Sequence, residues 1–168
     1  MLKLNRISAE ENGGVYLLSV LVIMAVVAID QFTKNVIATT MHQGQSIPVL
    51  ANVFHITYVG NPGAAFGMLA YRTQFFLVIT VVVLAAFVFF YRRLGNSRVL
   101  MRLSLALIVG GSLGNFVDRL RVGYVIDFLD FQVWPVFNVA DMAICIGVAL
   151  LCWEILRAPA KTNNETAG

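Results

Sequence analysis

Charged residues are scarce in this sequence. Of its 168 residues, 12% are Asp, Glu, Lys or Arg and 59% are hydrophobic, and the mean hydropathy is +0.80. Soluble domains carry about 25% charged residues, and a chain with so few cannot form the charged shell that such a domain needs. The composition therefore excludes an ordinary soluble domain and predicts an integral membrane protein.

Residues that bind metals or form disulfides are also rare. The chain has two histidines, His42 and His55, and two cysteines, Cys145 and Cys152. Within one helix the cysteines lie about 10 Å apart, too far for a disulfide. No His or Cys has the spacing of a metal site. The net charge of +3 comes from basic residues at the ends of apolar runs, not on an aromatic-rich basic face, which argues against nucleic-acid binding.

Long apolar runs dominate what is present. We expect a membrane all-α bundle of four transmembrane helices, each of about 20 residues, with a small β-rich cradle on the outer side. The first run, with its basic start, also fits a cleaved signal peptide, but Asp30-Gln31 follows it instead of a small-residue cleavage site. The expected spans lie at about 15–33, 75–91, 99–118 and 136–156. They form one membrane domain, 15–157, between an N-terminal segment, 1–14, and a tail, 158–168.

Lys and Arg are unevenly divided between the connections. Eight lie near the two ends of the chain and in the 92–102 loop, and four lie in the other two connections. The positive-inside rule therefore places both termini in the cytoplasm. The segment after the first span and the 119–135 loop then face outside.

Alternation in these outer segments predicts a small sheet, the cradle, at about 38–70. Phe54, Ile56 and Tyr58 alternate with polar residues, which is the pattern of a half-buried strand, and Gly60-Asn61-Pro62-Gly63 then indicates a turn. A shorter alternation runs from Val122 to Phe128 in the 119–135 loop. We expect the two segments to form a sheet at the outer membrane surface.

The acidic residues are segregated by type. All four Glu lie near the termini on the predicted cytoplasmic side, whereas all five Asp lie on the outer side. Acids at membrane depth are costly, so they are candidates for function. Three-residue helical spacing joins Asn115 to Asp118 and Asn138 to Asp141. We therefore expect one outer polar pocket, formed by Asp30, Asn115, Asp118, Asp127, Asn138 and Asp141.

Two of these acids also have a structural interpretation. Asp30 and Lys34 have the i,i+4 spacing of a helical ion pair. Asp118 is adjacent to Arg119 and close to Arg121, which favours a role as scaffolding. Asn115, Asp118 and Arg119 share one helical face.

The remaining acids differ in their surroundings. Asp130 is expected to be a solvated loop acid. Asp141 lies near a helix N-terminus, where complementing the helix dipole is as plausible a role as catalysis. Asp127 has apolar neighbours and no basic residue nearby, so we expect a raised pKa, which suits acid–base work. Ser112, in a glycine-rich stretch, is interpreted as a small residue for helix packing. Lys34 is the only outer lysine and leaves a Ser–Lys dyad open, but no serine is its obvious partner.

Five motifs follow one another along the chain. They are Asp30-Gln31-x-Thr33-Lys34, Asn61-x-Gly63-Ala64-Ala65-Phe66, Gly114-Asn115-x-x-Asp118-Arg119, Val125-x-Asp127-Phe128 and Phe137-Asn138-x-Ala140-Asp141. Together they resemble lipoprotein signal peptidase, the bacterial type II signal peptidase, from the first span to the last.

The resemblance implies an intramembrane aspartic protease of the bacterial inner membrane that needs no cofactor and no metal. Its substrates are prolipoproteins, cut before a diacylglyceryl-modified cysteine, and it works as a monomer in contact with membrane lipid. The catalytic pair falls on Asp127 and Asp141, and Asp30 with Lys34 is a structural pair. The matching supporting residues are Asn61, Gly63, Asn115, Asp118, Arg119 and Asn138.

Two other classes compete with this interpretation. Intramembrane acids also line the ion paths of small transporters, but such a path needs a polar group deep in the second span, where none is found. A structural or assembly subunit explains the small size but not five outer Asp residues.

Overall fold

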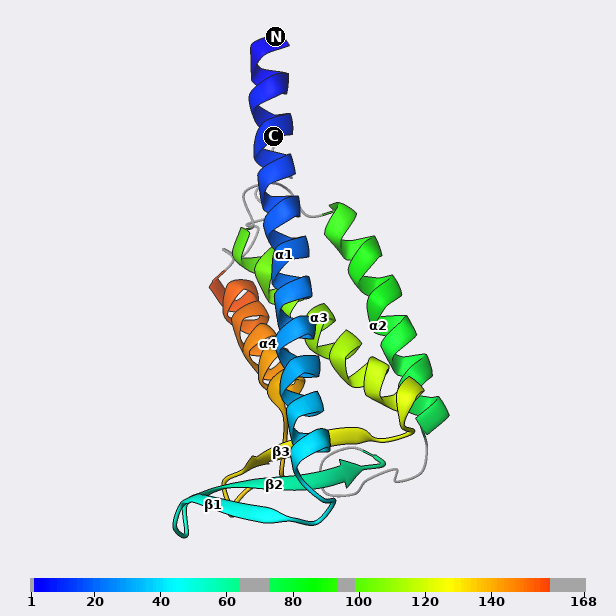
Figure 1. The fold of residues 1–168 in the computed structure, drawn as a ribbon. Coiled ribbons are helices and arrows are strands. Elements are labelled where there is room, and N and C mark those ends of the chain that lie inside the picture. The colour runs from blue at the N-terminus through cyan, green and yellow to red at the C-terminus, as the bar shows by residue number, and fades with distance from the viewer. Residues whose placement is uncertain (1, 64–72, 94–98, 158–168) are drawn as a thin grey trace, which may run out of the picture.

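Four helices and a small antiparallel sheet form the protein (Figure 1). The computed structural model describes residues 2–63, 73–93 and 99–157. In chain order the elements are α1 (Leu2–Thr40), β1 (Ser46–Leu50), β2 (Phe54–Asn61), α2 (Thr73–Arg93), α3 (Val99–Arg121), β3 (Val125–Asp130) and α4 (Val139–Arg157). The helices stand side by side and the sheet lies across one end of them, as the fold class predicted from the sequence requires.

Three helices in the described part of the chain are long and apolar enough to cross a membrane. They are Gly13–Thr40 of α1, Val99–Arg121 and Val139–Arg157. In α2, the apolar stretch found among the described residues is the shorter Gln74–Phe87. The helix α1 continues to Thr40, beyond the end at 33 expected for the first span, and α4 begins three residues later than expected.

The helix α3 lies at the centre of the bundle and packs against each of the other three. Glycines allow its close approach to α4. A Cβ on Gly111 would overlap the carbonyl oxygen of Ala140, and one on Gly147 would lie 2.7 Å from the carbonyl oxygen of Ser104. Such small residues bring helix backbones together in membranes, where apolar burial gives little driving force. This packing sets the beginning of α4 against the half of α3 that lies nearer the sheet.

The sheet has the strand order β1-β2-β3, and both pairs are antiparallel. The predicted strand at Phe54–Val59 is present as β2, and the second alternation gives β3, which begins at Val125. The strand β1 has no counterpart in the sequence analysis. All five of its residues are exposed and Pro48 stands in its middle, so it lacks the alternation that marks a half-buried strand.

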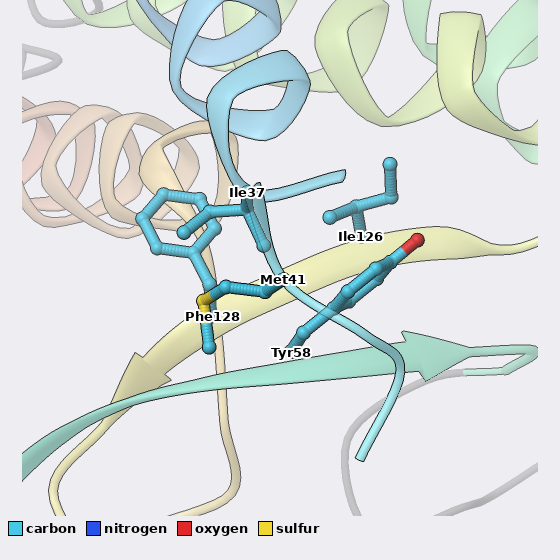
Figure 2. Packing of buried hydrophobic residues seen from close by; sticks show 5 residues of the cluster. All are labelled: Ile37, Met41, Tyr58, Ile126 and Phe128. Atoms are coloured by element: carbon cyan, nitrogen blue, oxygen red, sulfur yellow. The ribbon is translucent and has the colours of Figure 1, made fainter. Parts of the chain in front are cut away.

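The end of α1 packs directly on the sheet (Figure 2). Ile37 and Met41 form a buried cluster with Tyr58 of β2 and with Ile126 and Phe128 of β3. These contacts explain why α1 extends to Thr40, since its last turn covers this cluster. They also hold β3 beneath the bundle, with residues on both of its faces buried.

Candidate active site

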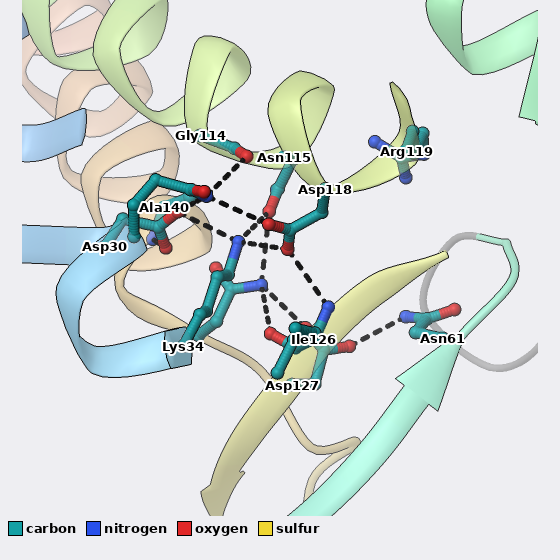
Figure 3. A network of polar contacts seen from close by, with 12 residues as sticks. Asp30, Lys34, Asn61, Gly114, Asn115, Asp118, Arg119, Ile126, Asp127 and Ala140 are labelled. Atoms are coloured by element: carbon teal, nitrogen blue, oxygen red, sulfur yellow. Dashed lines mark hydrogen bonds and ion pairs between the residues drawn. The ribbon is translucent and has the colours of Figure 1, made fainter. Parts of the chain in front are cut away.

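Polar side chains from α1, α3, β3 and α4 meet where the bundle contacts the sheet (Figure 3). At the centre is Lys34, which is 1% exposed. Its Nζ lies 2.9 Å from Oδ2 of Asp30 and 2.8 Å from Oδ2 of Asp118, and it donates to Oδ1 of Asn115 at 2.9 Å. The predicted Asp30–Lys34 ion pair is therefore present, as part of a larger network.

The two carboxylates paired with Lys34 also fix backbone groups. Oδ1 of Asp30 accepts the N–H of Ala140 at 2.9 Å, in the first turn of α4. Oδ2 of Asp118 accepts the N–H of Ile126 at 3.1 Å, in β3. A buried charge is stable in a protein only with such partners. The network therefore ties the start of α4 and the strand β3 to α1 and α3.

The contacts of Asp118 fit the scaffolding role favoured by the sequence, but they are made to α1 and β3 and not to the neighbouring arginines. Its ion-pair partner is Lys34, and its Oδ1 accepts from Nε2 of Gln31 at 2.9 Å. Gln31 also donates to the Gly114 carbonyl at 3.1 Å. The side chains of Asp118 and Arg119 leave α3 in different directions (Figure 3). Asp118 points toward α1, a helix distant in sequence, and finds its partners there. Gln31 occurs in the first motif, but its spacing alone gave no sign of this role.

Asn138 caps α4 and connects three parts of the site. Its Oδ1 accepts the N–H of Asp141 at 2.9 Å, while Oδ2 of Asp141 accepts the N–H of Asn138 at 3.3 Å, which is a reciprocal capping box. Its Nδ2 donates to Oδ1 of Asp127 at 2.6 Å and to Oδ1 of Asn115 at 3.1 Å. The cap explains why α4 begins at Val139.

Asp127 lies in β3 and is 2% exposed. Oδ2 accepts from Nδ2 of Asn61 at 2.9 Å. Burial, followed by the nearby charge of Asp141, raises the pKa of Asp127 to about 7, although hydrogen bonds from Asn61 and Asn138 and the charge of Lys34 act in the opposite direction. The raised pKa expected from its apolar neighbours is confirmed.

Asp141 lies in the first turn of α4. Oδ1 accepts from Nδ2 of Asn115 at 2.8 Å, and Oδ2 completes the capping box. Two N–H donors and the positive end of a helix stabilise a negative charge at this position. The two roles considered for Asp141 are therefore compatible, because a capping carboxylate also borders the cavity next to it.

A cavity of about 720 Å³ opens beside the two aspartates. Arg119 stands on its wall, where Nη2 donates to the Gly63 carbonyl at 3.3 Å and the guanidinium lies 4.6 Å from the ring centre of Phe76. The polar lining is Asn61, Gly63, Thr80, Ser112, Asn115, Arg119, Asp127 and Asp141, and the apolar lining includes Phe76, Ile79, Val83, Val136, Phe137 and Ile144. The residues expected to form one pocket therefore fall into two groups. The catalytic candidates face the cavity, while Asp30, Lys34 and Asp118 lie behind them.

The expectation that Asp130 is a solvated loop acid is wrong. It is the last residue of β3 and is buried. Oδ2 accepts from Oγ1 of Thr57 at 2.7 Å and Oδ1 accepts the N–H of Gln132 at 2.9 Å. Thr57 comes from the neighbouring strand, so local sequence carried no signal of it. Ala64, Ala65 and Phe66 of the second motif lie outside the described residues. Within the described ranges, no three His, Cys, Asp or Glu are grouped to hold a metal ion.

The chain is similar to known proteins over most of its length. A family model described as signal peptidase (SPase) II matches residues 22–157. The lipoprotein signal peptidase of Moorella thermoacetica is 52% identical over 145 residues, which cover 86% of this chain and 97% of that one. That of Pelotomaculum thermopropionicum is 43% identical over 145 residues, covering 86% and 95%.

The fold is also that of an experimentally determined protein. A bacterial membrane enzyme, determined by the in meso method at 2.3 Å resolution, superposes with a TM-score of 0.81 at 36% identity and covers 89% of this chain and 94% of its own. The resemblance found in the five motifs is thereby confirmed. The chain therefore belongs to the signal peptidase II family, the lipoprotein signal peptidases, and is a membrane protease.

Proposed function

We propose that this protease removes the signal peptide of prolipoproteins by cutting before a diacylglyceryl-modified cysteine, with Asp127 and Asp141 as its catalytic pair. The observation that carries the proposal is the placement of the two carboxylates. They come from different elements, line one cavity, and Asp141 contributes to raising the pKa of Asp127 to about 7. Two acids that cannot both ionise cheaply share one proton, which is the condition for aspartic protease chemistry.

The surroundings of the pair support a division of roles. Asp127 carries the shared proton, because it is the more deeply buried of the two and its pKa is raised. Asp141 carries the negative charge, which is stabilised by the Asn115 amide and by the helix N-terminus.

The reaction then needs no group beyond these carboxylates and a water molecule. Asp141 takes a proton from water as the water oxygen attacks the scissile carbonyl carbon, and Asp127 gives its proton to the carbonyl oxygen. The tetrahedral intermediate collapses when Asp141 returns its proton to the leaving nitrogen and Asp127 recovers its own from the hydroxyl. The C–N bond breaks, and both acids return to their starting forms.

The supporting residues keep this geometry fixed. Asn61 and Asn138 each donate to a different oxygen of Asp127, and Asn115 donates to Asp141. Arg119 and the Gly63 carbonyl form the adjoining wall, where a substrate main chain would lie. Lys34, with Asp30 and Asp118, has a structural role and holds together the elements that carry the pair.

We place the site at the outer face of the bacterial inner membrane, in a multi-pass protein that acts as a monomer. The excess of Lys and Arg near the termini supports cytoplasmic ends. The N-terminal end of α1 and the C-terminal end of α4 lie at the end of the bundle opposite the sheet (Figure 1). Water would reach the aspartates from outside, and the lipidated substrate would come from the bilayer.

The test is cleavage of a diacylglyceryl-modified prolipoprotein by the purified protein in detergent. Asp127→Asn and Asp141→Asn should each lower kcat by about 10²–10⁴-fold, the usual contribution of an acid or base. Asp130→Asn is the matched control, because Asp130 lies in the same strand and is held by Thr57 instead of facing the cavity. It should cleave as the wild type does.

Two results would contradict the proposal. Full cleavage by either the Asp127 or the Asp141 variant removes that residue from the pair. Loss of activity in a chelator, restored by a divalent metal, replaces the acid pair with metal chemistry.

A further inference from the structure

The cavity changes character along its length. The end next to the sheet holds the two aspartates with Asn61 and Arg119, beside apolar residues of the segment before α4 such as Val136 and Phe137. The part away from the sheet is lined mainly by apolar side chains of α2 and α4, including Ile79, Val83 and Ile144. Ser112 of α3 lines the same cavity. It stands three residues before Asn115, which is about 4.5 Å along the helix axis, away from the sheet. Ser112 therefore marks the boundary between the polar end and the apolar part.

The hydroxyl of Ser112 differs from six other helix hydroxyls. These six, all within the described helices, donate to a carbonyl oxygen of their own helix: Ser19, Thr33, Thr39, Thr40, Thr80 and Ser104. Ser112 makes no side-chain hydrogen bond to any residue in the described parts of the chain. A half-buried hydroxyl without a partner is an available donor, and here it borders a cavity large enough for a substrate.

We propose that Ser112 donates a hydrogen bond to an ester carbonyl of the diacylglyceryl group on the substrate cysteine. This inference rests on the proposed function and extends it to recognition of the lipid. Like the cavity, the lipidated cysteine changes from polar to apolar along its length. It begins at the peptide, continues through a glycerol whose ester oxygens only accept hydrogen bonds, and ends in alkyl chains.

The order of the lining residues agrees with this assignment. With the peptide bond at Asp127 and Asp141, the cysteine side chain and the glycerol carry the ester carbonyls away from the aspartates, and we assign them to the apolar part of the cavity. A hydroxyl about one helical turn from Asn115 is placed to meet them. Beyond it, Ile144 and Cys145 of α4 and Val83 of α2 provide an apolar surface for the chains.

The experiment compares two peptides that differ in the lipid linkage alone. One carries ester-linked acyl chains on the cysteine-bound glycerol, and the other carries ether-linked alkyl chains of the same length, which lack the carbonyl oxygens. Both are cleaved in an ester-free detergent, so that bulk lipid supplies no carbonyl group. Ser112→Ala should lower kcat/KM for the ester peptide by about 2- to 10-fold and leave the ether peptide unchanged.

Two matched variants test whether the effect belongs to Ser112. Ser104→Ala removes a hydroxyl from the same helix that is bonded to the Leu100 carbonyl, and Thr80→Val removes one from the cavity wall that is bonded to the Phe76 carbonyl. Both should keep the wild-type ratio of ester to ether cleavage. If wild type cleaves and Ser112→Ala keeps that ratio, the inference is overturned while the proposed function stands. Wild type that cleaves neither peptide overturns both.

Discussion

Asn115 donates through Nδ2 to Oδ1 of Asp141 at 2.8 Å, while its own Oδ1 accepts from Nζ of Lys34 at 2.9 Å. An ammonium group only donates hydrogen bonds, so Lys34 fixes which end of the amide faces which neighbour. The N–H end must then face Asp141, where it stabilises negative charge. Lys34 therefore influences Asp141 through the orientation of Asn115.

Replacing Asn115 with Asp should reverse this effect. The variant substitutes an acceptor for the donor that faces Asp141 and adds a negative charge beside it. We expect kcat for prolipoprotein cleavage to fall by about 100-fold, which is the scale of losing one aligned donor at a charged catalytic group. Asn35→Asp makes the same change at an exposed position of α1 and should cleave normally. Equal activity in the two variants would show that the bond to Asp141 has no part in catalysis.

Lys34 should matter more for stability than any exposed charge of the protein. Lys34→Met leaves Asp30 and Asp118 buried without their cation, and breaking a buried pair in this way costs about 3–5 kcal/mol. Thermal unfolding in detergent should show a clearly lower Tm. Adding Asp30→Asn and Asp118→Asn to the same variant removes the orphaned charges and should recover part of the loss. A single variant as stable as the wild type would mean that these charges are not coupled.

Much of this site could be predicted from local sequence. Asp127 among apolar neighbours implied its raised pKa, and the spacing of Asn138 and Asp141 placed them on one turn, which the capping box explains. Neither prediction depended on partners from elsewhere in the chain.

The errors arose where a distant partner decided the outcome. Asp130 is buried because Thr57 of β2 lies beside it. Asp118 has contacts that fit the expected scaffolding role, but its partners Lys34 and Gln31 come from α1, which its sequence neighbours did not indicate. Strand β1 was not predicted because all of its residues are exposed, so buried and exposed positions do not alternate along it. Only its pairing with β2 defines it as a strand. Local spacing cannot identify contacts made between separate elements.

The pH dependence of cleavage should follow the protonation of Asp127. Its pKa is raised to about 7, so it holds its proton below that pH and loses it above. Because the proposed mechanism needs this proton on the carbonyl oxygen, kcat/KM should fall toward tenfold per pH unit on the alkaline side of about 7. The measurement is a pH profile of kcat/KM with a lipidated precursor, between about pH 5 and 9. A profile that stays flat to pH 9 would exclude Asp127 as the proton donor.

Folding stability should depend on the same proton, with a defined sign. The pKa of Asp127 rises from 3.8 to about 7 on folding, so between these values the folded state binds more protons than the unfolded state. Stability therefore decreases as pH rises through this window, by a few kcal/mol in total, and levels off above about 7. The Tm of wild type, measured from pH 4 to 8, should decline more steeply than that of Asp127→Asn. Parallel curves for the two proteins would contradict the shift.

Gly111 should be required for the placement of Asp141. A Cβ at this position would overlap the carbonyl oxygen of Ala140 and lie 2.8 Å from Cγ1 of Ile144, so Gly111→Ala must push the first turns of α4 away from α3. Overpacking of this kind costs about 1–3 kcal/mol. Because Ala140 directly precedes Asp141, the shift also lengthens the Asn115–Asp141 hydrogen bond, and we expect kcat to fall as well as Tm. Gly14→Ala is the control, since a Cβ there has no atom within 4 Å. If Gly111→Ala lowers Tm but cleaves at the wild-type rate, the catalytic geometry does not depend on the α3–α4 contact.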